Sequence, residues 1–412
     1  MRRVVISGLG MVTPVGLTTE QSWINITAGN SGVDKITAFD ASDYSVNIAA
    51  EVKNFDPLQY MDAKEARKST RFIQLAVAAA KEALQDSGLQ LNGDSSRYGC
   101  AIGVGIGSMA DMSSTSIAMH EGGHKKVSPF FIPYVITNMA AGIVANTYNL
   151  KGPNICPTTA CTSGTHAVGE GFLYIKNGMA DVMLCGGSES AICEVAVYGF
   201  GNMKALSRNN LDPKLASRPF DKDRDGFVIG EGAGLLVLEE YEHAKARGAK
   251  IYAELRGYGM SADAYHITSP SPHGEGAARC MSAALKSANL PAKAIDYINA
   301  HGTSTYYNDM YESEAIQTVF GEHAKKVAIS STKGVTGHCL GAAGGIEAVV
   351  LAKSIHEGVI PPTAGLRVPG EECPLDYVPG SSRKKTLGAA ISNSFGFGGT
   401  NGTIVMTHVE FE

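Results

Sequence analysis

Short apolar runs bounded by glycine alternate along this chain with longer alanine-rich segments. Runs of this kind occupy residues 4–6, 101–104, 181–185 and 234–238, and each predicts a buried strand. Between the first two, residues 72–84 carry their apolar side chains at helical spacing. Strands that alternate with helices in this order predict a mainly parallel α/β architecture.

Glycine is frequent, with 48 residues among 412, and much of it is clustered. Dense clusters lie in residues 103–107, 341–345 and 396–399. Residues without a side chain let one backbone segment approach another segment, or a ligand, closely. The chain length predicts more than one domain-sized unit and allows a large buried core.

Composition and charge exclude several classes of protein. The net charge of −5 argues against nucleic-acid binding, which needs a concentrated positive field. Eight cysteines without repeated C-x-x-C pairs predict reduced thiols, and neither a disulfide framework nor a zinc site. The first apolar run is too short for a signal peptide, and no run is long enough to span a membrane. We therefore expect a soluble, cytoplasmic protein that binds neither nucleic acid nor membranes.

A charged segment predicts the boundary between two halves of the chain. Residues 240–247 have the composition of an exposed helix and separate two apolar strands. We therefore expect an N-terminal half at residues 1–250 and a C-terminal half at residues 251–412.

The two halves also look alike. In the first, a strand end at residues 154–155 leads through a turn into a small-residue helix that carries Cys161. In the second, a strand at residues 327–330 leads through a turn into a small-residue helix that begins near His338. This similarity predicts an internal duplication, which would bring the two segments together.

Cys161 is the candidate nucleophile. It lies where a strand has ended and a helix of small residues begins. Unpaired backbone N–H groups and the positive end of the helix dipole at such a place predict a stabilised thiolate and a lowered pKa. The alternative is a buried structural cysteine, which is the role we expect for Cys100, Cys156, Cys185 and Cys193.

Two histidines, His301 and His338, each lie in a turn of small residues. A thiol can hold an acyl group as a thioester, and two neutral imidazoles can donate hydrogen bonds to an enolate oxygen as its charge develops. A protease of the papain type would instead need one histidine and an Asn or Asp that orients it. The combination indicates a decarboxylating condensation that forms a carbon–carbon bond.

Other residues near the histidines support this chemistry. Thr303 and Thr305 are two residues apart in an extended segment, so their hydroxyls point the same way and can bond the amides of a linear thioester carrier. Lys333 and Glu347 are expected to form a buried ion pair that orients the site. Phe397 lies between glycines, so that its loop can move the ring and present a backbone N–H to an oxyanion. A plain hairpin turn is the alternative for this loop.

At these residues the chain resembles the β-ketoacyl-acyl-carrier-protein synthases, most closely the synthase II group of dissociated fatty-acid synthesis. The similarity spans nearly the whole chain, with ordered motifs around Cys161, His301 and His338. It implies a thiolase fold, with two related halves in five α-β-α-β-α layers, and a homodimer. It also implies an acyltransferase that condenses malonyl-acyl-carrier protein with an acyl group on Cys161 in fatty acid elongation. No metal or redox cofactor is implied, because the substrates are carried on the phosphopantetheine of acyl carrier protein.

The resemblance also implies roles for individual residues. The catalytic residues would be Cys161, His301 and His338. The supporting residues would be Lys333, Glu347 and Phe397. The substrate-binding residues would be Thr303, Thr305, Ile106, Phe395 and the partner subunit's Phe131. The positions that face the acidic carrier protein would be Lys64, Arg67, Lys68, Lys125, Lys126 and Lys204.

One residue departs from the family pattern, and two other functions stay open. Tyr306 follows the His301 motif where the family usually has proline, so that the pantetheine loop is expected to differ in shape. The chain could also be the ketosynthase subunit of an aromatic polyketide system, or a non-catalytic chain-length partner, although Cys161 argues against the latter. A thiolase would need a second reactive cysteine near the C-terminus, where this chain has Phe395 and Phe397.

Overall fold

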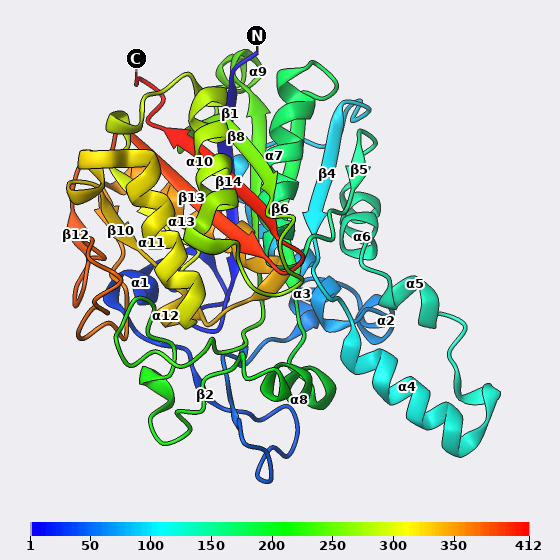
Figure 1. Ribbon diagram of the computed structural model, residues 1–412. Coiled ribbons are helices and arrows are strands. Elements are labelled where there is room, and N and C mark those ends of the chain that lie inside the picture. Colours follow the sequence, from blue (N-terminus) through cyan, green and yellow to red (C-terminus); the bar gives the residue numbers. More distant parts are fainter. Residues whose placement is uncertain (1, 412) are drawn as a thin grey trace.

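Ten strands of the chain form one sheet in the computed structural model, which describes residues 2–411 (Figure 1). The order across this sheet is β5-β4-β6-β7-β1-β8-β14-β13-β9-β10. The first five strands come from the N-terminal half: β1 (Val4–Val12), β4 (Tyr98–Gly103), β5 (Asn154–Ile155), β6 (Val182–Glu189) and β7 (Gly232–Glu240). The other five come from the C-terminal half: β8 (Ala253–Ala262), β9 (Tyr297–Asn299), β10 (Ala328–Ser330), β13 (Ala389–Gly396) and β14 (Thr400–Thr407).

The two halves of the sheet have the same topology. Counted in chain order, the strands of each half are arranged as first, fifth, fourth, second, third. The directions repeat as well, because β7 is antiparallel to β1 and β6 just as β14 is antiparallel to β8 and β13, and the outer strands are parallel. The halves join where β1 pairs with the first residues of β8. The internal duplication that the sequence suggests is therefore present in the sheet.

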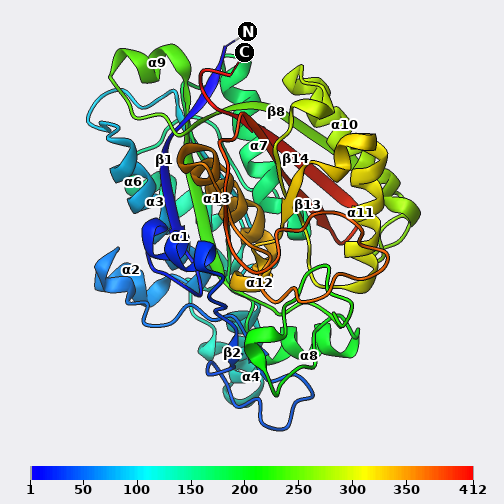
Figure 2. The same ribbon diagram turned by 90° about the vertical axis from the view of Figure 1, so that its left-hand side faces the viewer.

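Helices cover both faces of each half sheet. The inner helices α7 (Ser163–Lys176) and α13 (Ala343–Glu357) contact each other and strands of the sheet, and Figure 2 shows them between the two halves. The outer helices α3 (Arg71–Ser87) and α6 (Met139–Tyr148) cover the N-terminal half, and α10 (Glu275–Ala288) and α11 (Tyr306–Phe320) the C-terminal half. This arrangement has the α-β-α-β-α layers of the expected thiolase fold.

Shorter elements connect these layers. The remaining helices of four or more residues are α1 (Thr19–Ala28), α2 (Ala63–Lys68), α4 (Met109–Gly122), α5 (Phe131–Val135), α8 (Glu194–Asn202), α9 (Tyr241–Ala246) and α12 (Lys333–Thr336), together with the 3-10 helix η7 (Gly321–Lys325). Two small ribbons pair β2 (Asp34–Lys35) with β3 (Ile48–Ala49), and β11 (Val359–Ile360) with β12 (Arg383–Lys384). None of the helices in the described part of the chain has the length and apolar character needed to cross a membrane.

The predicted elements are present, and most extend beyond the predicted ranges. The helix predicted at residues 72–84 runs over the whole of α3, which ends where Gly88 takes the left-handed conformation with φ of 62°. The second of the two strands that residues 240–247 were expected to separate is β8, which begins at Ala253. The predicted boundary between residues 250 and 251 lies in the connection between α9 and β8.

The inner helices pack closely because glycine replaces side chains at their contact. A Cβ atom added to Gly164 of α7 would lie 2.6 Å from the backbone nitrogen of Gly345 in α13. A Cβ atom on Gly345 would overlap the backbone of Gly234 and Gly187 in the sheet. Each of these glycines is therefore needed for close approach of backbone to backbone.

The substitution Gly345→Ala is expected to destabilise the fold. The added methyl group meets backbone that cannot move aside, and such overpacking costs about 3 kcal/mol, more than the ~1 kcal/mol that alanine gains in a helix. Thermal unfolding measures the difference. The matched control is Gly199→Ala in α8, where the added Cβ has no atom within 4 Å and stability should rise slightly. Equal melting temperatures for the two variants would contradict this packing argument.

Candidate active site

Three segments from both halves of the chain meet at one cavity of about 490 Å³. Cys161 lies in the 3-10 turn η3 (Ala160–Thr162), directly before α7. His301 follows β9, and His338 follows α12. All three side chains line the cavity, so the duplicated topology brings the residues that the sequence singled out to one place.

The geometry pairs the thiol with one of the histidines. His338 Nε2 lies 3.0 Å from Cys161 Sγ. On the other side of the ring, His338 Nδ1 accepts the backbone N–H of Leu340 at 3.3 Å. A neutral imidazole whose Nδ1 accepts carries its proton on Nε2, so this proton faces the cavity. The ring centroids of His301 and His338 are 5.4 Å apart and their planes are nearly perpendicular, at 85°.

Burial keeps both histidines neutral. The pKa of His301 and that of His338 are lowered well below 6.5, mainly because both rings are buried, and secondarily because the Lys333 ammonium lies close. The Nδ1 atom of His301 has no hydrogen-bond partner among the described residues. Two neutral rings that each carry one N–H are the donors that the proposed enolate needs.

The prediction of a lowered thiol pKa was wrong. Burial raises the pKa of Cys161 to about 11, although the Lys333 charge and the Phe397 backbone N–H both lower it. Only 9% of the Cys161 surface is exposed, so the cost of removing a thiolate from water outweighs the nearby N–H groups. The sequence shows the helix terminus, which favours a thiolate, but it does not show that the Cys161 side chain is buried.

Lys333 and Glu347 form the ion pair predicted for them. Their side chains are 1% and 2% exposed, and the Lys333 ammonium donates to Glu347. The same ammonium donates to the backbone carbonyl of His301 at 2.6 Å. Burial raises the pKa of Glu347 to about 7, while Lys333 opposes this shift. The pair therefore connects α12 and α13 to the loop that carries His301.

The loop around Phe397 is a hairpin turn that reaches the thiol. It joins β13 to β14, so the plain hairpin expected as the alternative is present. The backbone N–H groups of Phe397 and of Cys161 itself both approach the sulfur. The Phe397 ring contacts the ring of Phe200, with centroids 6.4 Å apart. The hairpin thus supplies one amide donor and an aromatic ring, and η3 supplies the second donor, while the role of these donors in an oxyanion hole stays a prediction.

Four of the positions expected to bind substrate, Thr303, Thr305, Ile106 and Phe395, also line the cavity. The hydroxyl oxygens of Thr303 and Thr305 are 2.9 Å apart, so the two side chains do point the same way. Ile106 and Phe395 line the cavity too, as does Lys204 from the group assigned to carrier docking. Phe131 of this chain lies elsewhere, at the start of α5.

The other basic residues assigned to docking lie outside the cavity. Lys64, Arg67 and Lys68 belong to the short helix α2, Lys64 in its first turn and the other two in its last turn. The Lys68 ammonium lies 4.0 Å from the ring centroid of Phe130, which precedes α5. This contact brings α2 next to the connection that carries Lys125 and Lys126.

Tyr306 occupies the position where the family pattern has proline. It is the first residue of α11, a position that suits proline because the N–H there has no intrahelical partner. Its ring is 51% exposed at the cavity and lies 5.0 Å from the guanidinium carbon of buried Arg224. A helix therefore starts at this residue without proline.

Sequence reasoning missed two buried carboxylates behind the reactive loops. Glu312 accepts the backbone N–H groups of His301 and Gly302, both at 2.8 Å. Glu189 accepts N–H groups from the loop that carries Ile106. For Glu189 the sequence offers one signal, because this carboxylate lies at the end of an apolar run. For Glu312 it offers none, because this residue lies within a polar helix.

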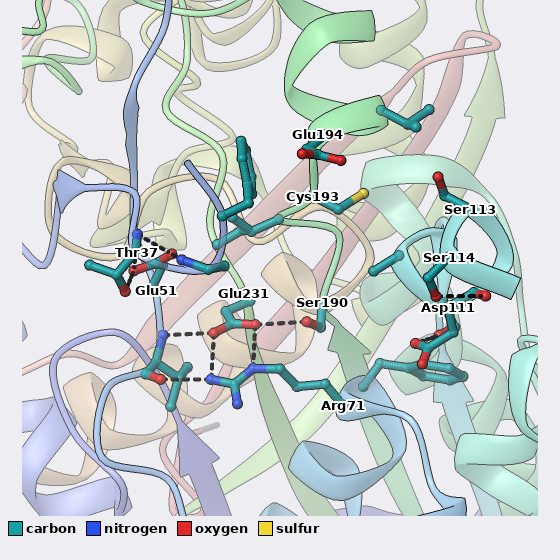
Figure 3. A pocket seen from close by; sticks show the side chains of 18 of the residues that line it. Thr37, Glu51, Arg71, Asp111, Ser113, Ser114, Ser190, Cys193, Glu194 and Glu231 are labelled. Carbon is teal, nitrogen blue, oxygen red and sulfur yellow. Dashed lines mark hydrogen bonds and ion pairs between the residues drawn. The ribbon is translucent and has the colours of Figure 1, made fainter. Parts of the chain in front are cut away.

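A second cavity, of about 810 Å³, is lined by the segment after β3, the start of α3, α4 and the start of α8 (Figure 3). Figure 3 shows Arg71 reaching both carboxylate oxygens of Glu231, at 2.7 and 2.8 Å, and Ser190 donating to the same carboxylate. Glu51 accepts the backbone N–H groups of Thr37 and Ala38. Charged side chains that line this second cavity are thus largely paired with one another or bonded to backbone N–H groups. Among the described residues that line the second cavity there is no histidine.

Alkylation of Cys161 by iodoacetamide should rise about tenfold per pH unit from about pH 7 to about pH 10. Only the thiolate reacts, and burial raises the thiol pKa to about 11. Mass spectrometry of the modified peptide measures the rate, with buried Cys100 as the internal control that stays unmodified while the fold is intact. A rate that is already constant above about pH 8 would show a thiolate formed at neutral pH and contradict this result.

Two family models match most of the chain. The model for the Beta-ketoacyl synthase, N-terminal domain, matches residues 1–244, and the model for the Beta-ketoacyl synthase, C-terminal domain, matches residues 252–367. The chain is also 50% identical, over 409 residues, to a 3-oxoacyl-[acyl-carrier-protein] synthase 2 of Coxiella burnetii, with 99% of each chain covered.

Solved structures agree with these matches. A Beta-ketoacyl synthase from Burkholderia phymatum is similar to the chain with a TM-score of 0.93 and 36% identity, over 100% of both chains. A ketosynthase solved with its type II PKS acyl-carrier protein, and bound to the hexaketide, is similar with a TM-score of 0.92 and 36% identity, over 99% of this chain and 100% of that chain.

Proposed function

The chain belongs to the β-ketoacyl synthase family, and on this premise we propose how its cavity carries out the reaction. The enzyme is an acyltransferase of fatty acid elongation, which condenses malonyl-acyl carrier protein with an enzyme-bound acyl group and yields 3-oxoacyl-acyl carrier protein. The proposal rests on one observation. In a single cavity, Cys161 Sγ lies 3.0 Å from His338 Nε2, and the ring of His301 lies beside that of His338.

The first half-reaction transfers the acyl group to Cys161. The sulfur attacks the thioester carbonyl of acyl-acyl carrier protein, and the backbone N–H groups of Cys161 and Phe397 stabilise the oxyanion that forms. The carbon–sulfur bond to pantetheine breaks, and the thiol proton goes to the departing carrier thiolate. Thr303 and Thr305 bond the pantetheine amides and hold the arm in place.

The second half-reaction forms the carbon–carbon bond. His301 and His338 each donate an N–H to the thioester carbonyl oxygen of malonyl-acyl carrier protein while the carboxylate leaves as carbon dioxide. The enolate carbon then attacks the Cys161 thioester, and the sulfur leaves as a thiolate that takes a proton from water, which restores the thiol. The product is two carbons longer than the acyl group. Lys333 and Glu347 hold the His301 loop. Loss of carbon dioxide supplies the driving force, so the proposal includes no metal or redox cofactor.

Incubation with a long-chain acyl-acyl carrier protein should add one acyl group to the wild-type enzyme and none to Cys161→Ala. Malonyl-acyl carrier protein should then discharge the adduct, with release of a 3-oxoacyl product, because the two steps share one nucleophile. Intact-mass spectrometry measures both steps. The matched control is Cys156→Ala, which changes a partly buried cysteine outside the cavity and should acylate normally. Elongation by Cys161→Ala would refute the mechanism.

The polyketide alternative differs in its primer. A polyketide ketosynthase is among the similar structures, at 36% identity, whereas relatives named 3-oxoacyl-[acyl-carrier-protein] synthase 2 reach 50%. These identities favour fatty acid elongation. A series of primers separates the two functions, since repeated condensation on one chain without reduction would indicate a polyketide system.

Acyl carrier protein docks on basic residues in this proposal. The solved ketosynthase in complex with its acyl-carrier protein supports a carrier as the partner. Lys68 on α2 contacts Phe130, which lies in the same connection between α4 and α5 as Lys125 and Lys126. Exposed cations of this kind steer an acidic partner and are screened by salt.

The double substitution Lys64→Glu and Lys68→Glu should raise the KM for acyl-acyl carrier protein about tenfold at low salt, because it reverses two charges that attract the carrier. The value of kcat should change little. Steady-state kinetics at low and at about 0.5 M salt measure the effect, which should shrink as salt screens the charges. Lys286→Glu, on exposed α10, is the control and should leave KM unchanged. A salt-independent loss would contradict docking by charge.

A homodimer is the assembly that we propose. The outer strand of the C-terminal half is covered, since β10 is buried and Ile329 donates its N–H to the carbonyl of Asp376. The equivalent strand β5 lies at the other end of the sheet, within residues 151–160 that are all exposed or half-buried. Apolar side chains are exposed nearby on α4, α5 and their connections, namely Met112, Ile117, Met119, Phe130, Ile132 and Ile136. An open strand edge beside an apolar surface favours pairing with a second copy.

Light scattering should give twice the chain mass of 43.2 kDa for the wild-type protein. Ile132→Glu should shift the mass toward one chain, because it places a charge on a surface that the dimer would bury. The matched control is Ile24→Glu on α1, where the side chain is similarly exposed, 56% against 61%, and the dimer should persist. A wild-type mass of one chain would refute the dimer and the proposed role of the partner subunit's Phe131.

A further inference from the structure

Glu189 is a buried carboxylate whose bonding partners are all backbone N–H groups. It ends β6, and its surface is 0% exposed. One oxygen accepts the N–H groups of Gly105 at 2.8 Å, Ile106 at 3.0 Å and Gly341 at 3.2 Å. The other oxygen accepts the N–H of Gly107 at 2.7 Å. Four donors on one carboxylate compensate for removing its charge from water.

These bonds hold two loops that come from different halves of the chain. Gly105, Ile106 and Gly107 follow β4 in the N-terminal half, whereas Gly341 belongs to η8 (Leu340–Ala342), three residues after His338. The loops touch directly, because a Cβ atom on Gly341 would overlap the backbone nitrogen of Gly105. Glu189 is the side chain that bonds to both.

Both loops form walls of the catalytic cavity. The Ile106 side chain lines it and packs against the apolar cluster that contains Cys161 and Leu340. Leu340, from the second loop, also lines it. A shift of either loop therefore changes the space beside the thiol, where the acyl group on Cys161 must lie.

We propose that Glu189 is a positioning residue that sets the acyl chain length of this enzyme by holding the Ile106 wall and the loop behind His338 in one register. This inference rests on the proposed function, since it concerns the acyl group held on Cys161. The fixed walls limit the room beside the sulfur. Without the carboxylate the N–H groups of the Ile106 loop lose their acceptor, the wall moves, and longer acyl groups fit.

Burial raises the pKa of Glu189 to about 7, while its N–H partners lower it. The ionised carboxylate has the acceptor sites that four donors need, and a neutral amide in its place has one acceptor oxygen and turns a donor toward the Gly107 N–H. Glu189→Gln at about pH 8 therefore removes the charge and the bond to Gly107, and it weakens the remaining bonds, with little change in size.

The test compares dodecanoyl- and hexanoyl-acyl carrier protein as primers for wild type, Glu189→Gln and Glu189→Asp at about pH 8. The ratio of kcat/KM for the longer primer to that for the shorter should rise about fivefold or more in Glu189→Gln, the scale expected when a hydrogen bond to a buried charge is lost. Glu189→Asp keeps the charge but retracts the carboxylate oxygens by one methylene, so the ratio should rise less in this variant. If Glu189→Gln does not fold, the aspartate variant carries the test.

The matched control is Glu51→Gln, which removes another buried carboxylate that accepts backbone N–H groups, in the second cavity (Figure 3). Its primer ratio should stay at the wild-type value. A uniform fall in all rates, an unchanged ratio or a fall in the ratio for the Glu189 variants would overturn the proposal, because a merely structural residue affects both primers alike.

A carrier-free measurement separates this inference from the proposed function. Alkylation of Cys161 by N-octylmaleimide, relative to iodoacetamide, reports the room beside the thiol without any condensation. This ratio should also rise about fivefold or more in Glu189→Gln and stay unchanged in Glu51→Gln. If wild type made no 3-oxoacyl product, the proposed function would fail while the alkylation ratio still decided the role of Glu189; an unchanged alkylation ratio would overturn that role.

Discussion

The close contact between α7 and α13 is the constraint on which the rest of the structure depends. These two helices lie between the half sheets, and glycine lets their backbones meet, since a Cβ on Gly164 would lie only 2.6 Å from the Gly345 nitrogen and 3.0 Å from the Gly341 carbonyl oxygen. The turn that carries Cys161 leads into the first helix, and the turn after His338 leads into the second. Because the helices meet near these starting turns, the thiol and the imidazole lie 3.0 Å apart although they come from different halves.

Burial then decides the protonation of the groups that this contact assembles. The thiol, both imidazoles and the Lys333–Glu347 pair lie in the interior, where a charge is costly unless it is paired. The imidazoles are neutral and the thiol is protonated, while the Lys333 ammonium beside them is matched by the Glu347 carboxylate and the His301 carbonyl. A condensing enzyme needs N–H donors rather than charged acids at this place, so the burial that keeps both imidazoles neutral suits the chemistry.

The two halves share a topology but contribute different parts of the site. The turn after β5 carries the nucleophile, whereas the equivalent segment after β10 carries Lys333 and His338, and the loop after β9 carries His301. The halves also differ at their outer edges, because β10 is covered by its own chain and β5 is not. One repeated scaffold thus supplies a two-part active site and, in our proposal, one surface for self-association.

The sequence by itself determined the local structure and the identity of the reactive residues. The apolar runs predicted the central strands, helical spacing predicted α3, and the motifs around Cys161, His301 and His338 carried the resemblance to the family. These features depend on residues that are near one another in the chain, so periodicity, turn chemistry and motif spacing suffice to find them.

Only the tertiary structure decided the environment of those residues. The pKa of the Cys161 thiol is raised and not lowered, because segments from both halves of the chain bury this side chain. The partners of Glu189 and Glu312 were likewise decided by the tertiary structure. Glu189 accepts the N–H of Gly341, far away in the sequence, and Glu312 accepts the N–H of His301. Desolvation and hydrogen bonding sum over everything within a few ångströms, and no local pattern records which distant segments will fill that space.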